Sequence, residues 1–205
     1  MTASAWPVMG MKPSAGCPYS DAVEAAEETC QSFVQMWAEA VVRQVKRVRE
    51  VRRKAHSLGR SYERMDGEWS ADELDLARCF REQWAEEQAL VWAAHQVERW
   101  ARRLAEERGE EPPPRDQVLA NLRNALEHLD EAEFEGHHAV PGDGSRSLKE
   151  LPGSRLRIAT ADGGLAFGLI DVSELEKRAL GVVRAVEDEL MEEAADWWAE
   201  MSSGR

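Results

Sequence analysis

Three residues near the middle of the chain carry side chains that together suit phosphate chemistry. Arg123, Asn124 and His128 lie in the stretch Arg-Asn-Ala-Leu-Glu-His. An arginine is a permanent cation suited to phosphate, and a histidine accepts or donates a proton near neutral pH. A cation that binds phosphate and a group that transfers a proton are the minimum that cleavage of RNA without a metal ion requires.

The three residues lie in a predicted amphipathic helix over residues 115–131, which follows Pro114. Apolar residues recur there at three- and four-residue steps and form one stripe. On a regular helix Arg123 and His128 point about 140° apart, one on each margin of the stripe, where a cleft would open. The same residues also fit ordinary surface pairs, Arg123 with Glu127 and Asn124 with His128.

The arginine, the adjacent asparagine and the histidine after four intervening residues resemble the signature of the HEPN superfamily. The preceding stretch adds to the resemblance with a glutamate-rich first half, an alanine-rich middle and an aromatic end, so that about residues 72–131 are covered. The resemblance implies an all-helical domain and a metal-independent endoribonuclease of toxin or phage-defence type. Its products would carry 2′,3′-cyclic phosphate ends.

The resemblance also implies a role for each motif residue and a homodimer. His128 would act as general base or acid, Arg123 would stabilise charge on the phosphate, and Asn124 would orient the phosphate or the histidine. A two-fold axis would bring Arg123 of one copy near His128 of the other. Glu87 would support a motif arginine, although a helix-margin glutamate in contact with water fits its position equally well.

Charge is unevenly distributed along the sequence. The chain has a net charge of −13, which argues against a generic nucleic-acid binder, yet residues 43–64 carry a local charge of +7. This basic cluster supplies the predicted substrate-binding residues, which are Arg47, Arg49, Arg52, Arg53 and Lys54. A solvated helix face whose charges balance acidic neighbours, or complement the helix dipole, is the alternative interpretation.

Other patterns exclude several classes of site. Cys17, Cys30 and Cys79 are widely separated and form neither a disulfide framework nor a zinc pattern. The sequence contains no P-loop and no HExxH motif, so we predict no cofactor and no metal. Without a secretory signal or a long apolar run, we expect a cytoplasmic chain that does not contact a membrane.

The periodicity predicts an all-α fold, an antiparallel four-helix, HEPN-like bundle with long helices and a small β-hairpin before the last one. Residues 1–19 are predicted to be a flexible arm, and residues 20–205 a single domain. Helices are expected over about 20–56, 70–108 and 115–131 and from Ser173 onward, with loops over 58–69 and 134–154 and the hairpin over about 155–170.

A second function fits the same sequence. An acidic helical bundle without catalysis would dimerise or bind a protein partner, whereas the ribonuclease would bind RNA and an antitoxin. Two features of the fold would discriminate between them. A basic cluster beside the Arg123 and His128 cleft favours the enzyme, and an acidic last helix over that cleft favours the interaction protein.

Overall fold

A computed structural model describes residues 18–64, 71–143, 146–159 and 164–203. The predicted arm over 1–19 lies almost entirely outside the described residues. Four helices account for most of the chain: α1 (Pro18–Arg64), α2 (Glu73–Arg108), α3 (Gln117–Glu127) and α4 (Val172–Ser202). Between α3 and α4 lie three short 3₁₀ helices, η1 (Leu129–Glu131), η2 (Ser147–Glu150) and η3 (Pro152–Ser154). The described residues also form five short strands: β1 (Ala132–Glu135), β2 (His138–Pro141), β3 (Leu156–Arg157), β4 (Leu165–Ala166) and β5 (Ile170–Asp171).

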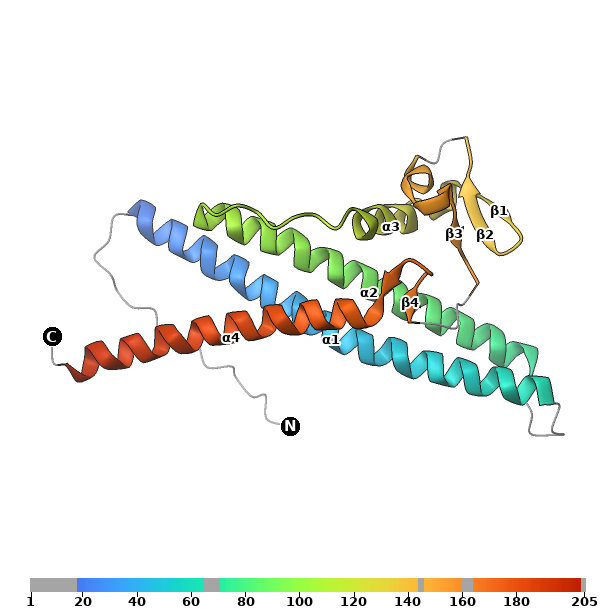
Figure 1. Cartoon of the computed structure of the whole chain (residues 1–205), viewed down its shortest axis with the longest axis horizontal. Helices are drawn as coiled ribbons and strands as arrows, with labels where there is room; N and C mark the ends of the chain where they lie inside the picture. Colours follow the sequence, from blue (N-terminus) through green and yellow to red (C-terminus); the bar gives the residue numbers. More distant parts are fainter. Residues whose placement is uncertain (1–17, 65–70, 144–145, 160–163, 204–205) are drawn as a thin grey trace.

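The long helices α1 and α2 form an antiparallel hairpin, and the two other helices lie against it (Figure 1). The shorter α3 packs on α2, while α4 packs mainly on the first half of α1. The β1–β3 sheet lies beside the end of α3, and the β4–β5 hairpin leads directly into α4 (Figure 1). The prediction of a mostly helical chain with small antiparallel strands before the last helix is therefore confirmed.

Several predicted helix ends differ from the observed ones. The first helix extends to Arg64 rather than residue 56, so the predicted loop over 58–69 is wrong as far as residue 64. The end of α2 agrees with the prediction, since Gly109 adopts a left-handed conformation (φ 69°) and donates to the carbonyls of Ala105 and Glu106. The helix predicted over 115–131 is shorter, because Asp116 caps its start and His128 its end.

The strands were predicted with the wrong partners. Residues 134–154 were expected to be a loop, but β1 and β2 form an antiparallel hairpin there, with Glu135 opposite His138. Gly136 makes this tight turn at φ 57°, a conformation that other residues adopt only with strain. In place of the single predicted hairpin, β3 pairs with β2 and β4 pairs with β5. The alternation of apolar and polar residues predicts extended segments, but it does not specify which segments hydrogen-bond to each other.

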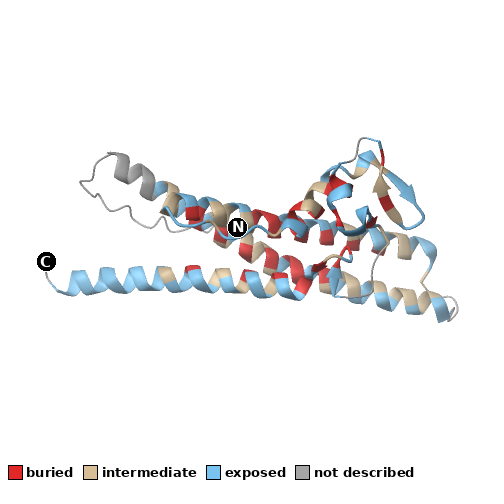
Figure 2. Ribbon diagram, turned by 45° about the horizontal axis from the view of Figure 1, so that its top comes forward, coloured by how far each residue is buried: buried red, intermediate tan, exposed pale blue. Residues whose placement is uncertain are grey.

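The core lies where the four helices meet, near the middle of α1 and α2 (Figure 2). Its fully buried aliphatic side chains come from three helices: Val41, Val45 and Val48 of α1, Leu90 and Val91 of α2, and Leu119 and Leu122 of α3. Each contributes about 1.5–3 kcal/mol by leaving water. Leu175 and Ala179 join them from α4. None of the described helices has the length and apolar character that crossing a membrane would require.

The first half of α2 buries polar side chains. Gln83 and Glu87 are buried, whereas the apolar Phe80 is 39% exposed. A buried carboxylate requires a compensating charge and hydrogen-bond donors. The spacing of apolar residues does not predict which groups from other elements supply them. The first half of α2 therefore brings the polar groups of Gln83 and Glu87 into the interior.

Candidate functional site

An open groove with a volume of about 940 Å³ lies between α2 and α3. Five arginines line it: Arg99, Arg102, Arg103, Arg115 and Arg123. Three glutamates, Glu98, Glu106 and Glu150, line it as well. The groove therefore carries a net positive charge on a chain whose overall charge is −13. A cationic concavity of this kind attracts anionic ligands.

The position of α3 beside α2 is set by contacts at the start of α3. Arg102 of α2 donates to the carbonyl of Pro113 (2.8 Å), which holds the proline-rich connection against α2. Asp116 accepts a hydrogen bond from the backbone N–H of Leu119 (3.0 Å) and caps the helix. Its other carboxylate oxygen contacts Arg178 of α4 (3.1 Å). The connection and α4 together thus place α3 so that Arg123 and Asn124 line the groove.

Arg123 is held at the groove by a carboxylate and by an aromatic ring. Its guanidinium forms an ion pair with Glu127, one helical turn later, and its Cζ atom lies 5.0 Å from the ring centroid of Trp92. A cation over the face of a tryptophan is attracted by the ring quadrupole. The Nε atom of Arg123 is buried and has no hydrogen-bond partner among the described residues. The surface pair with Glu127 that the sequence allowed is therefore present, and Arg123 also lines the groove.

His128 lies outside the set of residues that line the groove in the described structure. It is the C-cap of α3, and its backbone N–H donates to the carbonyl of Asn124 (3.2 Å). Its Nδ1 atom lies 3.0 Å from the carboxylate of Glu131. A proton on Nδ1 would be donated to Glu131, which makes Nε2 the acceptor and orients the ring for acid–base chemistry. Glu131 was not identified from the sequence, although its spacing of three residues from His128 allowed such a contact.

The basic cluster of α1 does not line the groove in the described structure. Arg49 contacts Glu176 of α4 (2.7 Å) and Lys54 contacts Glu82 of α2 (2.6 Å). Arg47 and Arg53 are exposed on α1. The acidic second half of α4 does not line the groove either, so neither of the two discriminating arrangements is present.

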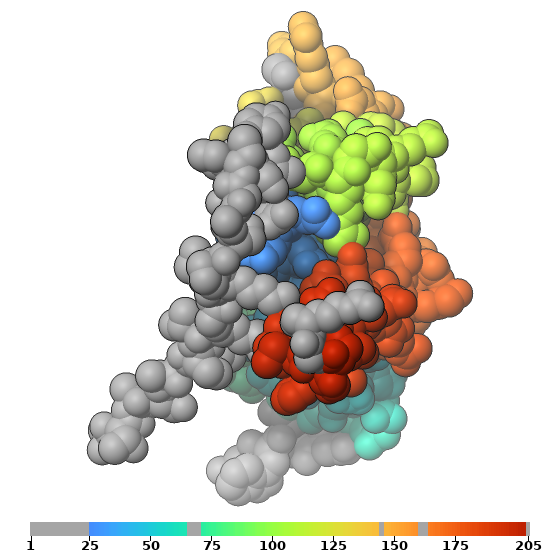
Figure 3. Space-filling model, turned by 90° about the vertical axis from the view of Figure 1, so that its left-hand side faces the viewer, coloured from blue at the N-terminus to red at the C-terminus, as the bar shows by residue number. Residues whose placement is uncertain are grey.

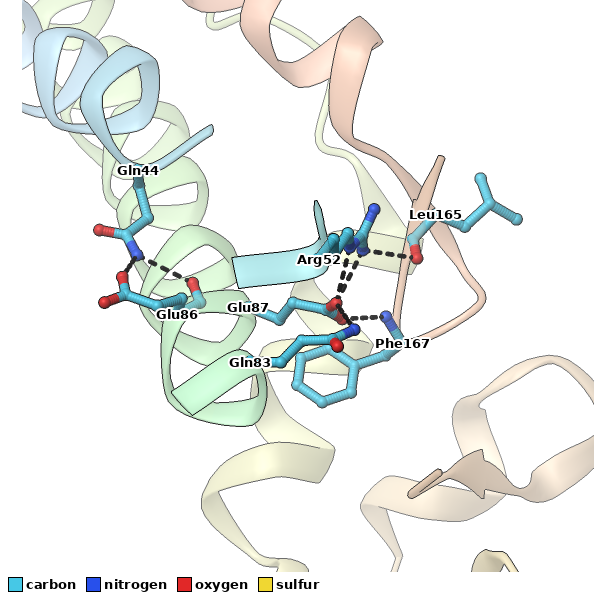
Figure 4. Close-up of polar contacts among 7 residues, drawn as sticks. All are labelled: Gln44, Arg52, Gln83, Glu86, Glu87, Leu165 and Phe167. Carbon is cyan, nitrogen blue, oxygen red and sulfur yellow. Dashed lines mark hydrogen bonds and ion pairs between the residues drawn. The ribbon is translucent and has the colours of Figure 1, made fainter. Parts of the chain in front are cut away.

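Arg52, the remaining member of the cluster, and Glu87 form a buried polar network (Figure 4). The Nε and Nη2 atoms of Arg52 lie 2.9 and 2.8 Å from one oxygen of Glu87. Gln83 donates to that same oxygen (2.9 Å), and the backbone N–H of Phe167 donates to the other (3.0 Å). Arg52 also donates to the carbonyl of Leu165 (2.9 Å). The network joins α1 and α2 to the β4–β5 hairpin, so the interpretation of Glu87 as a water-contacting residue is wrong.

His95 is a groove residue that the sequence analysis did not single out. It is buried, lines the groove, and has an Nδ1 atom without a hydrogen-bond partner among the described residues. Burial lowers the pKa of His95 below its usual value, and the nearby charge of Arg123 lowers it further. On the same groove, burial raises the pKa of Glu98, with a further contribution from Asp116. Both groups are thus displaced toward their neutral forms.

The lowered pKa of His95 predicts a loss of stability on acidification. Below about pH 6.5 the unfolded chain binds a proton at this histidine while the folded chain resists it. Stability from this group is therefore present above that pH and is lost as the pH falls toward the folded-state pKa. Urea unfolding at pH 7.5 and pH 5.5 should show a smaller difference in unfolding free energy for His95→Gln than for wild type. An equal difference in both proteins would contradict the prediction, and exposed His137→Gln is the matched control.

The groove arginines could have been found only partly from the sequence. Arg99, Arg102 and Arg103 recur at helical spacing on α2, but equal spacings occur on many solvated helices.

Among the described residues, no group of three or more His, Cys, Asp or Glu side chains is placed to hold a metal ion. No family model matches the chain, and neither the curated proteins nor the solved structures include a match to it.

Proposed function

We propose that this chain is an RNA-binding, metal-independent endoribonuclease of HEPN type, in which RNA lies in the groove between α2 and α3. The observation that carries the proposal is the arginine lining of that groove, which includes Arg123 and Asn124 of the motif. Arginine forks bind phosphate oxygens bidentately, and the amides of the groove supply neutral donors. The phosphate backbone of RNA is the ligand class that this combination suits.

The chemical step is assigned to the motif residues. His128, with Glu131 on its Nδ1 atom, would take the proton of a ribose 2′-hydroxyl through Nε2. The 2′-oxygen would attack the adjacent phosphorus, and the bond from that phosphorus to the 5′-oxygen of the next nucleotide would break. The leaving 5′-oxygen would take a proton from water, and a 2′,3′-cyclic phosphate would remain. Arg123 would stabilise the negative charge on the phosphate oxygens. A two-fold dimer of HEPN-like bundles would bring the histidine of one copy to the arginine of the other.

Cleavage of total RNA by the purified chain in the presence of EDTA tests the proposal. The expected result is fragments with 2′,3′-cyclic phosphate ends, identified by end-specific ligation. Absence of fragments from a folded chain that nonetheless binds RNA would restrict the function to binding. Absence of both binding and cleavage would overturn the proposal.

Reversal of the groove charge should weaken RNA binding in a salt-dependent way. Arg99 and Arg115 are exposed and line opposite sides of the groove. For Arg99→Glu/Arg115→Glu, the slope of log affinity against log salt should fall by about 0.7 for each lost phosphate contact on single-stranded RNA. The control Arg43→Glu/Arg184→Glu makes the same charge change at exposed sites outside the groove. Equal weakening by both variants, measured by fluorescence anisotropy, would contradict a specific role for the groove.

Partner binding without catalysis is a second candidate function. The observation that favours it is the second half of α4, where large apolar side chains are exposed beside a run of carboxylates. Such a surface repels RNA and suits a protein ligand. If the chain forms a stable complex through α4 but neither binds nor cleaves RNA, this second function is the better description.

A further inference from the structure

The second half of α4 presents an apolar stripe that the described residues of the chain do not cover. After Glu187, every described residue of α4 except Glu189 is exposed, as Figure 2 shows. The exposed large apolar side chains there are Leu190, Met191, Trp197, Trp198 and Met201. Leu190, Trp197 and Met201 recur at helical steps of seven and four, and Trp198 packs edge-on against Trp197 with ring centroids 5.1 Å apart. A contiguous apolar stripe of this kind is typical of an interaction surface.

The charge beside this stripe restricts what can cover it. Residues 187–200 contain seven carboxylates, Glu187, Asp188, Glu189, Glu192, Glu193, Asp196 and Glu200, and no lysine or arginine. A ligand for this surface must therefore be both apolar and basic, because an acidic one would be repelled. Packing of one α4 second half against another would bring like charges together.

The path of α4 leaves a matching surface uncovered by the described residues. Near its start, Glu176 of α4 contacts Arg49 (2.7 Å). Just beyond the middle of α4, Glu189 contacts Gln31 (3.1 Å) and Arg108 (2.6 Å). The helix thus follows α1 from residue 49 back toward its N-terminus, and the end-on view shows residues of α1 between α4 and the end of α2 (Figure 3). The opposite half of the α1–α2 hairpin, beyond residue 49, projects past α4 (Figure 1).

This distal part of the hairpin, residues 50–64 and 73–82, has the required chemistry. It exposes the cations Arg53, Lys54, Arg60, Arg64, Arg78 and Arg81 together with the large apolar side chains Leu74 and Phe80. The same residues also carry five carboxylates, Glu50, Glu63, Glu73, Asp75 and Glu82, so that with Arg52 the seven cations exceed the carboxylates by two. Lys54 and Arg78 make only exposed ion pairs, with Glu82 and Asp75. Exposed pairs of this kind are weak and can be exchanged for a partner's carboxylates.

We infer that the second half of α4 binds the distal part of the α1–α2 hairpin of a second copy of this chain. The two copies lie side by side with their long axes antiparallel. Because each copy carries both surfaces, the two-fold arrangement makes the same contact twice and closes the assembly at a dimer. This interface does not depend on RNA cleavage, and it is distinct from the pairing of Arg123 and His128 across a two-fold axis that the proposed function uses.

The inference predicts dimers in solution that depend on both surfaces. Sedimentation equilibrium of the full chain should give a dimer, and Trp197→Asp/Trp198→Asp should raise its dissociation constant by at least about tenfold. Arg53→Glu/Arg60→Glu, on the distal part of the α1–α2 hairpin, should raise the dissociation constant of the dimer by a comparable factor. Phe134→Asp, which changes a similarly exposed side chain on β1, should leave the dimer intact. Far-UV circular dichroism establishes that each variant is folded.

Mixing the two monomeric variants distinguishes this arrangement from others. A heterodimer of the α4 variant with the hairpin variant retains one intact contact, so mixing should restore dimers that neither variant forms alone. If α4 bound α4 instead, the hairpin variant would dimerise like wild type. Wild type that stays monomeric at about 100 μM, a hairpin variant that dimerises normally, or a mixture that stays monomeric would each overturn the inference.

Discussion

Replacing Glu87 with alanine is expected to lower the free energy of unfolding by about 3–5 kcal/mol, because it breaks a buried ion pair from one side. The Glu87 side chain is only 7% exposed and that of Arg52 only 15%. The variant would retain the contact of Arg52 with the Leu165 carbonyl but would lose the ion pair of Arg52 with the Glu87 carboxylate. The backbone N–H of Phe167 and the amide of Gln83 would also lose an acceptor. Urea unfolding followed by circular dichroism measures the loss.

An exposed pair between the same two helices provides the control. Lys54 and Glu82 have side chains that are 51% and 40% exposed, and Glu82→Ala should cost no more than about 1 kcal/mol. The double variant Arg52→Met/Glu87→Leu should be more stable than Glu87→Ala, because replacing both members of a buried ion pair with apolar side chains costs less than removing one member. Equal stability losses for Glu87→Ala and Glu82→Ala would show that burial does not set the strength of the Arg52 contact.

Under the proposed function, His128→Ala is expected to lower the rate of RNA cleavage by about 10²–10⁴-fold, the usual contribution of a positioned acid–base group. Arg123 and the groove arginines are unchanged in this variant, so RNA affinity should remain close to that of wild type. Single-turnover cleavage of a labelled RNA, combined with anisotropy measurements of binding, separates the two effects. A variant that binds less RNA but cleaves bound RNA normally would assign His128 to binding instead.

Two further substitutions make the test specific. His137→Ala removes another exposed histidine, in the turn between β1 and β2, and should leave cleavage unchanged. Glu131→Gln should lower the rate by a smaller factor of about ten, because an amide does not stabilise the charge of an imidazolium. Full activity in Glu131→Gln would show that the contact at Nδ1 has no part in the reaction. Equal losses for His128→Ala and His137→Ala would contradict the assignment of the motif histidine.

The elements that depend on local patterns were predictable from the sequence. Val34, Val41, Val45 and Val48 recur at helical spacing, and all four are buried in α1. The glycine and prolines after Arg108 end α2 because a left-handed glycine terminates a helix and prolines do not continue it. Local sequence also places Arg123 and Asn124 on a helix with an apolar stripe, so the existence of the motif-bearing helix follows from the chain itself.

Tertiary structure decided which side chains meet. The sequence placed Glu87 beside a motif arginine, but the fold brings Arg52 of α1 to it, and the N–H of Phe167 completes the carboxylate's hydrogen bonds. Two members of the basic cluster on α1 form ion pairs, Lys54 with Glu82 and Arg49 with Glu176, because the helices that carry those glutamates pack against α1. Such pairs depend on the relative rotation of helices, which a single-helix pattern does not contain.

The groove itself is a product of packing. Arg99 of α2 and Arg115 beside α3 are separated in the chain by a proline-rich connection, and the contacts of Arg102 and Asp116 bring them to one concave surface. The sequence by itself determined which residues carry positive charge, acid–base chemistry and helical periodicity. Only the tertiary structure decided which of them share a site, because charge compensation and the exclusion of water are set by neighbours from other elements.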